Sequence, residues 1–175
     1  MAKHYIKLPL EKNDIKKLES GDIAYLTGYL YTARDAAHNR LVNLLKENKK
    51  LPIKLKNETI YYVGPSPEKP GQVIGAAGPT TSYRMDPYTP ALIEKGLKGM
   101  IGKGKRSDEV VEYIKKYECI YFAAVGGAAA YISKCIKEKE LIAYEDLGPE
   151  AILRLYVEDF PVVVAIDSRG KNIYK

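Results

Sequence analysis

The sequence Gly78-Pro-Thr-Thr-Ser-Tyr-Arg84, followed at once by Met85-Asp86-Pro87, is the stretch around which the rest of the chain is organised. It follows a short apolar run at residues 73–77, which predicts a strand that ends where the motif begins. Gly78 permits unusual backbone angles and Pro79 removes a backbone donor, so a turn is expected. A turn with free N–H groups, three hydroxyls and a guanidinium suits a carboxylate or a phosphate. An ordinary Gly-Pro turn with small polar residues would have the same composition.

The length of 175 residues predicts one domain, residues 1–175, with a core of its own. The apolar and charged fractions are typical of soluble globular proteins. No apolar run approaches the roughly 20 residues needed to cross a bilayer. The N-terminal residues also lack the apolar core of a signal peptide. We therefore expect a cytoplasmic protein with no membrane contact.

The formal net charge of +6 is compatible with nucleic acid, an anionic small molecule or an acidic protein surface as partner. Because lysines alternate with glutamates in most segments and aromatic-basic RNA-binding motifs are missing, we expect no nucleic acid as partner. The two cysteines, Cys119 and Cys135, are too few for a disulfide framework or a four-cysteine metal site. They are expected to be buried free thiols, and no metal site is predicted in this chain.

Periodic and alternating stretches predict an α/β protein. The apolar run at residues 119–125 indicates a central strand that is covered on both faces. The Gly126-Gly127 pair after it leads into a helix, and its N–H groups are candidates for holding an anion. Further strands are expected at residues 4–10, 22–31, 59–63, 97–101, 141–144, 153–157 and 162–166, and helices at residues 32–48, 87–96, 108–117 and onwards from the glycine pair to about residue 137.

The predicted helix at residues 32–48 has polar residues on its inward face. Thr32 and Asp35 resemble a capping box, and Arg34 and His38 lie on the same stripe as the apolar leucines. A cation in the first helical turn opposes the helix dipole, unless an anion meets it beside the free N–H groups. One interpretation is therefore an anion site. The other is that Arg34 pairs with Asp35, and that His38 is a satisfied, semi-buried histidine.

A second glycine-rich turn, residues 102–107, is basic. Gly99, Gly104 and Lys105 have the spacing of a nucleotide-binding P-loop, but Arg106 stands where that motif needs a Ser or Thr for magnesium. Ser107 is better placed as the N-cap of the helix at residues 108–117. Nucleotide binding is therefore not expected. Lys103 or Lys105 either supplies a second positive charge to the site or belongs to a solvated basic turn.

Several of these segments together resemble the β subunit, or C-terminal domain, of class I iron–sulfur hydro-lyases, the fumarases and L-tartrate dehydratases. The resemblance covers nearly the whole chain, and its first three motifs are specific as a set. Two positions depart from the family pattern: Lys105 stands where Asn is more common, and Ala128 where Pro is common. The stretches that carry the resemblance are residues 32–38, 78–86, 102–107, 125–129, 144–148 and 157–161.

The resemblance implies a three-layer β/β/α swivelling domain that docks on a larger α subunit. In this family the α part carries a [4Fe–4S] cluster on three cysteines. This sequence lacks such a triad, so the cluster is expected on a separate α subunit and none is expected in this chain. The implied reaction is the reversible addition of water to a small dicarboxylate, such as fumarate to malate.

Removal of water from a 2-hydroxy diacid needs a base, a Lewis acid for the hydroxyl and cations for two carboxylates. Bidentate arginine fixes carboxylates best. By resemblance, Thr80 is the base, which needs activation because a threonine hydroxyl is a poor base alone. Asp35 and His38 complete the predicted catalytic group by orienting Arg34. The predicted substrate-binding residues are Arg34, Thr81, Arg84 and Lys103.

Other functions remain open on the sequence alone. An L-tartrate dehydratase β subunit would use the same mechanism, and nothing in the sequence separates one four-carbon diacid from another. A stand-alone dicarboxylate-binding module without catalysis is a second alternative. Self-association into a homodimer is also left open.

Overall fold

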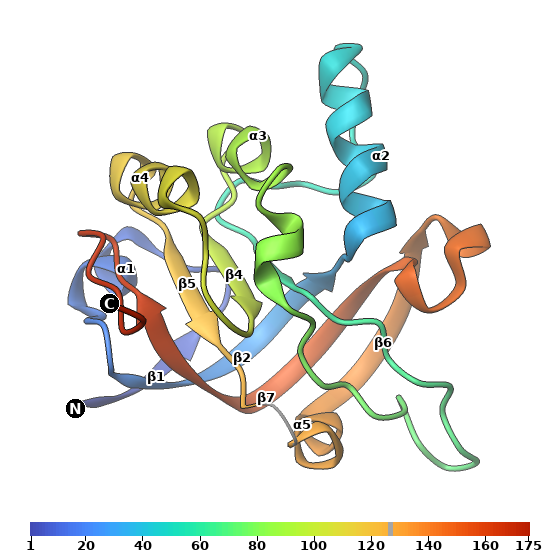
Figure 1. Cartoon of the computed structure of the whole chain (residues 1–175). Helices are drawn as coiled ribbons and strands as arrows, with labels where there is room; N and C mark the ends of the chain where they lie inside the picture. The colour runs from blue at the N-terminus through green and yellow to red at the C-terminus, as the bar shows by residue number, and fades with distance from the viewer. Residues whose placement is uncertain (126–127) are drawn as a thin grey trace.

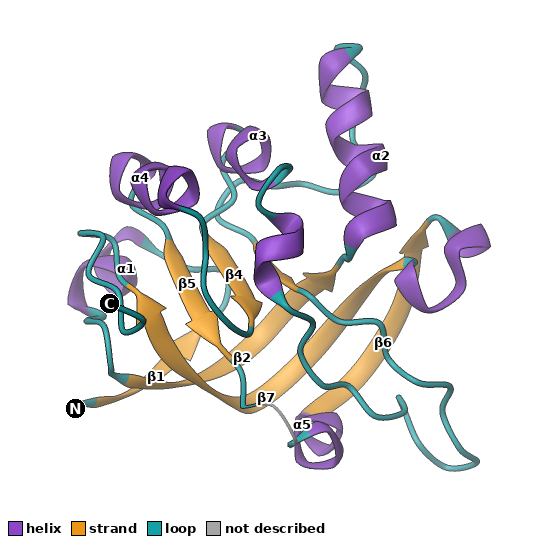
Figure 2. Cartoon of the chain, in the orientation of Figure 1, coloured by secondary structure: helices purple, strands orange, loops and turns teal. Residues whose placement is uncertain are grey.

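The computed structural model describes residues 1–125 and 128–175. Helices α2, α3 and α4 lie along one side of a strongly curved sheet, with α5 on the opposite side (Figure 1; Figure 2). The strands are β1 Lys3–Lys7, β2 Ile23–Thr32, β3 Thr59–Tyr61, β4 Gly99–Gly102, β5 Ile120–Ala123, β6 Ile136–Ala143 and β7 Ile152–Ile166. The helices are α1 Lys12–Lys17, α2 Asp35–Lys46, α3 Thr89–Glu94, α4 Asp108–Tyr117 and α5 Ala129–Cys135, with 3-10 turns η1 Ser82–Met85 and η2 Glu145–Glu150.

The strands form one seven-stranded mixed sheet with the order β1-β2-β3-β4-β5-β7-β6. Strands β1 to β5 pair in parallel, whereas β7 runs antiparallel to β5, β6 and β2. Because β7 pairs with both β5 and β2, the pairings close a circuit through β2, β3, β4, β5 and β7. The prediction of an α/β fold is confirmed.

The curled sheet separates two hydrophobic cores. Along β5, Phe122 belongs to the core enclosed by the curled sheet, and the next residue back, Tyr121, belongs to the core under the helices. The same alternation holds for Tyr61 and Ile60 of β3, as expected when successive side chains point to opposite faces. The apolar run at residues 119–125 is therefore covered on both faces, as predicted.

Several predicted elements have the expected type but different limits. Helix α4 spans residues 108–117 as predicted, and the Ser107 hydroxyl accepts a hydrogen bond from the Val110 N–H at 3.2 Å. Helix α1 was not predicted. Strand β7 continues through residues 158–161, where the sequence suggested a break. The chain accommodates that stretch with a bulge at Asp159, whose φ is +49°, and the two predicted strands are one.

Two predictions of local structure are wrong. Residues 73–77 form no strand: their backbone packs on the preceding loop, where Ser66 N–H donates to the Ala76 carbonyl at 2.9 Å. Thr32 does not cap a helix, because its hydroxyl donates to the Ala151 carbonyl at 3.3 Å and accepts from Leu153 N–H at 3.0 Å, tying β2 to β7. The helix predicted after the glycine pair is present as α5, but it ends at residue 135, and β6 begins directly after it.

The predicted anion-binding role of Gly126-Gly127 falls on residues outside the described part of the chain. Among the residues described, no helix combines the length and the apolar character that a bilayer crossing requires.

Candidate active site

The predicted site residues lie at the edge of the sheet where parallel strands end. Strands β2, β3 and β4 are consecutive parallel neighbours, so the segments that follow them emerge at the same edge. Arg34 and Asp35 follow β2, and Lys103 follows β4. Thr81 pairs with Lys103 through an isolated parallel bridge. Ligands of α/β proteins commonly bind where the carboxyl ends of parallel strands meet, so the location is a candidate for function.

Asp35 connects the two arginines of the site. Its Oδ2 accepts a hydrogen bond from Arg84 Nε at 3.1 Å, and Arg84 Nη2 lies 3.1 Å from the same oxygen. Arg34 Nε lies 3.7 Å from Asp35 Oδ1, which is an ion-pair distance but too long for a hydrogen bond. Among the described residues, neither of these two buried atoms has a hydrogen-bond partner. Both guanidinium groups thus lie beside one carboxylate, and each has N–H groups that this carboxylate does not bind.

The start of α2 presents Arg34 to this edge. Arg34 is the N-cap of the helix, with extended backbone, and not part of its first turn as predicted. Its side chain lies across Gly64, where an added Cβ would be 3.0 Å from Arg34 Nη1 and 3.1 Å from its Cδ. From η2, Glu150 Oε1 accepts a hydrogen bond from Ala36 N–H at 3.2 Å. The glycine makes room for the arginine, and the carboxylate fixes the helix terminus.

His38 holds the main chain of Arg34 and not its guanidinium. The side chain is fully buried, and its Nδ1 lies 2.8 Å from the Arg34 carbonyl oxygen. Because a carbonyl only accepts, Nδ1 carries the proton. Nε2 is buried without a partner among the described residues. Burial, followed by the charge of Arg106, lowers the pKa of His38 to about 4, against the favourable contact with the Arg34 carbonyl. The imidazole is therefore neutral near pH 7.

Acidification from pH 7 to pH 5 is expected to lower the free energy of unfolding by about 2 kcal/mol through His38. The unfolded histidine binds a proton near pH 6.5 and the folded one only near pH 4. The contribution of neutral His38 to the free energy of unfolding is therefore fully present above pH 6.5 and is lost as the pH drops towards 4. Urea unfolding at both pH values measures the loss. His38→Asn should reduce the loss; an unreduced loss in His38→Asn contradicts the account.

The segment at Thr80 is fixed by main-chain hydrogen bonds on both sides. Thr80 N–H donates to the Tyr62 carbonyl at 2.7 Å, just after β3. Lys103 N–H donates to the Thr80 carbonyl at 3.3 Å, and Ser82 N–H donates to the Lys103 carbonyl at 2.9 Å. Thr80 and Thr81 are half-buried, while Arg84 and Lys103 are exposed. Main-chain contacts thus bring the predicted threonines and Lys103 together, and the Asp35 side chain joins the two predicted arginines.

The sequence reasoning missed Arg106 as a structural centre of this edge. Its guanidinium is buried, with Nε donating to Asp86 Oδ1 at 2.7 Å and Nη2 to Thr89 Oγ1 at 2.9 Å. It lies over the rings of Tyr62 and Tyr121, at 5.3 and 4.8 Å from their centroids. The only signal in the sequence was an arginine in place of the expected Ser or Thr.

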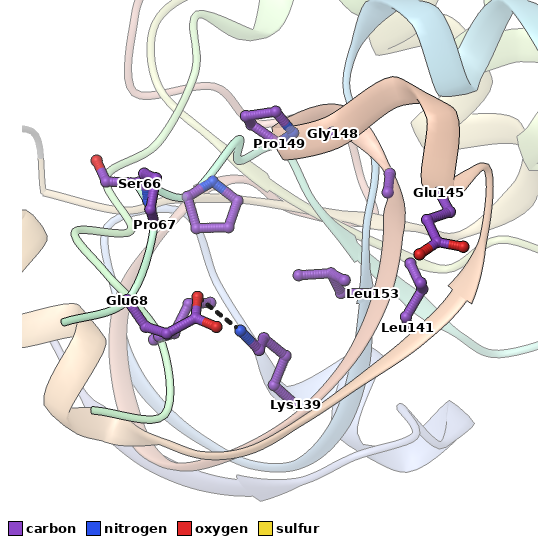
Figure 3. Close-up of a pocket in the computed structure, with 12 residues that line it drawn as sticks. Ser66, Pro67, Glu68, Lys139, Leu141, Glu145, Gly148, Pro149 and Leu153 are labelled. Carbon is purple, nitrogen blue, oxygen red and sulfur yellow. Dashed lines mark ion pairs between the residues drawn. The ribbon is translucent and has the colours of Figure 1, made fainter. Parts of the chain in front are cut away.

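A separate pocket of about 360 Å³ lies between the loop after Gly64 and η2 (Figure 3). Figure 3 shows Leu141 and Leu153 in its wall, and the ion pair between Glu68 and Lys139 at its side, with an O–N distance of 2.9 Å. None of the seven predicted site residues lines it. Its lining is mainly apolar, and its one cation, Lys139, is already paired with Glu68, so the pocket offers no free cation to a dicarboxylate.

The two cysteines belong to different cores. Cys119 lies under the helices and Cys135 in the core enclosed by the sheet, and both are buried free thiols, as predicted. Burial raises the pKa of Cys119 to about 12 and also raises the pKa of Cys135. Neither thiol therefore favours the thiolate form that metals bind. Within the described residues, no group of three or more His, Cys, Asp or Glu side chains could hold a metal ion.

Comparison with known proteins identifies the family. The model for the fumarase C-terminus matches residues 2–175. The chain belongs to the fumarase C-terminal family. This agrees with the resemblance read from the motifs at residues 32–38, 78–86 and 102–107.

Named relatives of this fumarase C-terminal chain differ in length. The "Putative L(+)-tartrate dehydratase subunit beta" of Methanocaldococcus jannaschii is 40% identical over 172 residues, which are 95% of this chain and 88% of the relative. The "Fumarate hydratase class I, anaerobic" of Escherichia coli is 39% identical over 152 residues, 86% of this chain but 28% of the relative. "Fumarate hydratase 2" of Leishmania major is 34% identical over 173 residues, which are 97% of this chain and 30% of the relative. The chain thus spans less than a third of these two hydratases.

Proposed function

We propose that this chain is the β subunit of a class I iron–sulfur fumarate hydratase. Arg34 and Arg84, joined through Asp35 beside Thr80 and Lys103 at one sheet edge, are the observation that carries the proposal. Three cations at one edge suit a substrate with two carboxylates. Membership of the fumarase C-terminal family gives the reaction class, reversible hydration of fumarate to malate.

The arginines bind and orient the diacid. Arg84 uses Nε and Nη2 on a single Asp35 oxygen, so its remaining Nη1 edge is left to a ligand. The Arg34 side chain is 23% exposed, which leaves its guanidinium partly open while its stem is packed on Gly64. A carboxylate near both would gain charge-assisted hydrogen bonds from donors that are already oriented. Lys103, one bridge away from Thr81, is placed to bind the second carboxylate.

Thr80 is proposed to move the proton next to one carboxylate, and Thr81 to hold the substrate. The main chain of Thr80 is tied to the segments after β3 and β4, so its hydroxyl has a defined position. Removal of its proton needs nearby positive charge, which Lys103 and the arginines supply, or a carboxylate from a partner chain. His38, neutral and buried, and Asp35 act by orienting Arg34 and not by exchanging protons with substrate.

The hydro-lyase chemistry of the family needs a Lewis acid, and the described residues of this chain include no group of side chains that could hold one. Cys119 and Cys135 lie in separate cores with raised pKa values, so they do not fit an iron–sulfur cluster. We propose that a partner α subunit carries the [4Fe–4S] cluster and completes the site. The beta-subunit name of the Methanocaldococcus jannaschii relative supports such a pairing.

Several coarser predictions belong to the same proposal. Two cores on either face of a curled sheet support a three-layer β/β/α arrangement, which we propose swivels as one domain, residues 1–175, on the α subunit. A cytoplasmic location and self-association of this chain into a homodimer remain predictions. The alternative activity, L-tartrate dehydration, is favoured by the name of the relative that this chain covers over 88% of its length.

Anaerobic co-expression with a candidate cluster-bearing α chain tests the function. We expect the purified pair to hydrate fumarate, measured by loss of fumarate absorbance, and the isolated chain to show no activity. Parallel assays with malate and tartrate decide between the two hydro-lyase activities. Fumarate hydration by the metal-free single chain, or a cluster-loaded pair inactive towards all three diacids, would refute the proposal.

A further inference from the structure

Asp86 occupies an anion site built by the second glycine-rich turn. Its carboxylate is nearly buried, with a side-chain exposure of 10%. Oδ1 accepts from Arg106 Nε at 2.7 Å, and Oδ2 accepts from Ser107 N–H at 2.6 Å. Ser107 is the N-cap of α4, so the carboxylate lies at the positive end of that helix. The P-loop-like turn therefore does bind an anion, and the anion is the chain's own.

The cation of this site stays in place by other contacts. Arg106 is packed between Tyr62 and Tyr121, and its Nη2 also donates to Thr89 Oγ1. These contacts do not neutralise its charge. Among the described residues, Asp86 is the only carboxylate that forms an ion pair with Arg106 within 4 Å. Loss of the carboxylate would leave a buried, oriented guanidinium beside a free helix N–H. Such a site should accept a small carboxylate from solution.

The site is open to solutes. A groove of about 590 Å³ runs directly beside it and is lined by Asp86, Arg106 and Ser107 together with Tyr83, Pro87, Lys105 and Glu109. A molecule as small as formate can enter from this groove once the Asp86 side chain is shortened.

Docking of Asp86 also fixes the segment that carries the candidate active site. Asp86 directly follows η1, Ser82–Met85, and Arg84 lies two residues before it. At the other end of η1, Ser82 N–H donates to the Lys103 carbonyl at 2.9 Å. The same turn, residues 102–107, thus holds η1 at both ends, with Arg84 between the two attachments.

We propose that Asp86 is a positioning residue, whose carboxylate is the internal ligand of an anion site formed by Arg106 and the Ser107 N–H. Its docking sets the place of Arg84. The positioning role rests on the proposed function, whereas the anion site does not. Two experiments therefore address the two parts separately.

The first experiment is chemical rescue in the isolated full chain. Asp86→Ala lowers the urea midpoint, and sodium formate raises it again. At ten times its Kd, formate raises the folded-to-unfolded ratio of the variant roughly tenfold. In wild type and in Asp86→Asn, whose amide fills the space, formate changes the folded-to-unfolded ratio by less than twofold relative to sodium chloride at the same concentration. An Asp86→Ala chain that formate stabilises no more than wild type overturns the anion site.

The second experiment measures the kinetics of the assembled enzyme without urea, at a temperature at which each variant is folded. Asp86→Asn raises KM for the diacid at least several-fold, with normal cluster content. Formate restores KM in Asp86→Ala, whereas in wild type it only competes with the diacid. Unchanged KM in Asp86→Asn overturns the positioning role, and this holds even if Asp86→Ala does not fold. Rescue of stability in a chain whose wild-type pair is inactive would refute the proposed function and leave the anion site intact.

Discussion

Replacement of Thr80 by alanine is expected to lower kcat of the assembled enzyme by about 10²- to 10⁴-fold, the range for loss of a general base. The segment should keep its position, because Thr80 is held through its main chain to Tyr62 and Lys103. The iron content of the proposed α subunit should therefore not change. Steady-state hydration of fumarate, together with iron and sulfide analysis, measures both quantities.

Two companion variants sharpen this test. Thr80→Ser keeps a hydroxyl and should keep most of the turnover. Thr81→Ala removes a substrate contact and should raise KM more than it lowers kcat. Full turnover in Thr80→Ala with wild-type cluster content would end the assignment of Thr80 as the base.

Replacement of Arg106 by methionine is expected to reduce the free energy of unfolding by about 3–5 kcal/mol, the cost of breaking a buried ion pair. Asp86 would keep only the Ser107 N–H as a partner for a nearly buried carboxylate. The hydrogen bond to Thr89 would also be lost. Urea unfolding of the isolated chain at pH 7 measures the effect.

The chain contains a matched control for this variant. Arg40 and Asp146 form a bidentate pair, with N–O distances of 2.9 and 2.6 Å, on the protein surface. Solvent screens such a pair, so Arg40→Met should leave the urea midpoint almost unchanged. Similar losses for the two variants would show that burial of the Arg106 pair is not what makes it important.

The elements that local pattern determines were predictable. Helix α4 has a Ser107 cap and a clear apolar stripe, and β5 is an apolar run between two turns, so both were located from the sequence. Tertiary contacts decided the failures. Thr32 looked like a helix cap, but its hydroxyl finds partners in residues 151 and 153, far along the chain. Residues 73–77 are apolar enough for a strand, but they pair with a loop instead.

The grouping of the candidate residues at one edge could be predicted from the sequence, but the contacts that build this edge could not. Arg34, Thr80 and Arg84 were selected from motifs, and the structure places them on the same sheet edge. The supporting residues were invisible to the sequence reasoning, because their partners are distant. Gly64 lies under Arg34, and Arg106 pairs with Asp86, 20 positions earlier. Neither relationship has a local sequence pattern.

The central claim is that the arginines and Thr80 of this chain meet a diacid which a cluster-bearing partner also binds. A crystal structure of the anaerobically assembled pair with malate tests this most directly. We predict one malate carboxylate at about 2.7–2.9 Å from guanidinium nitrogens of Arg34 or Arg84, with the Thr80 hydroxyl facing the carbon that loses its proton. Malate held entirely by the partner, or on another face of this chain, would contradict the account.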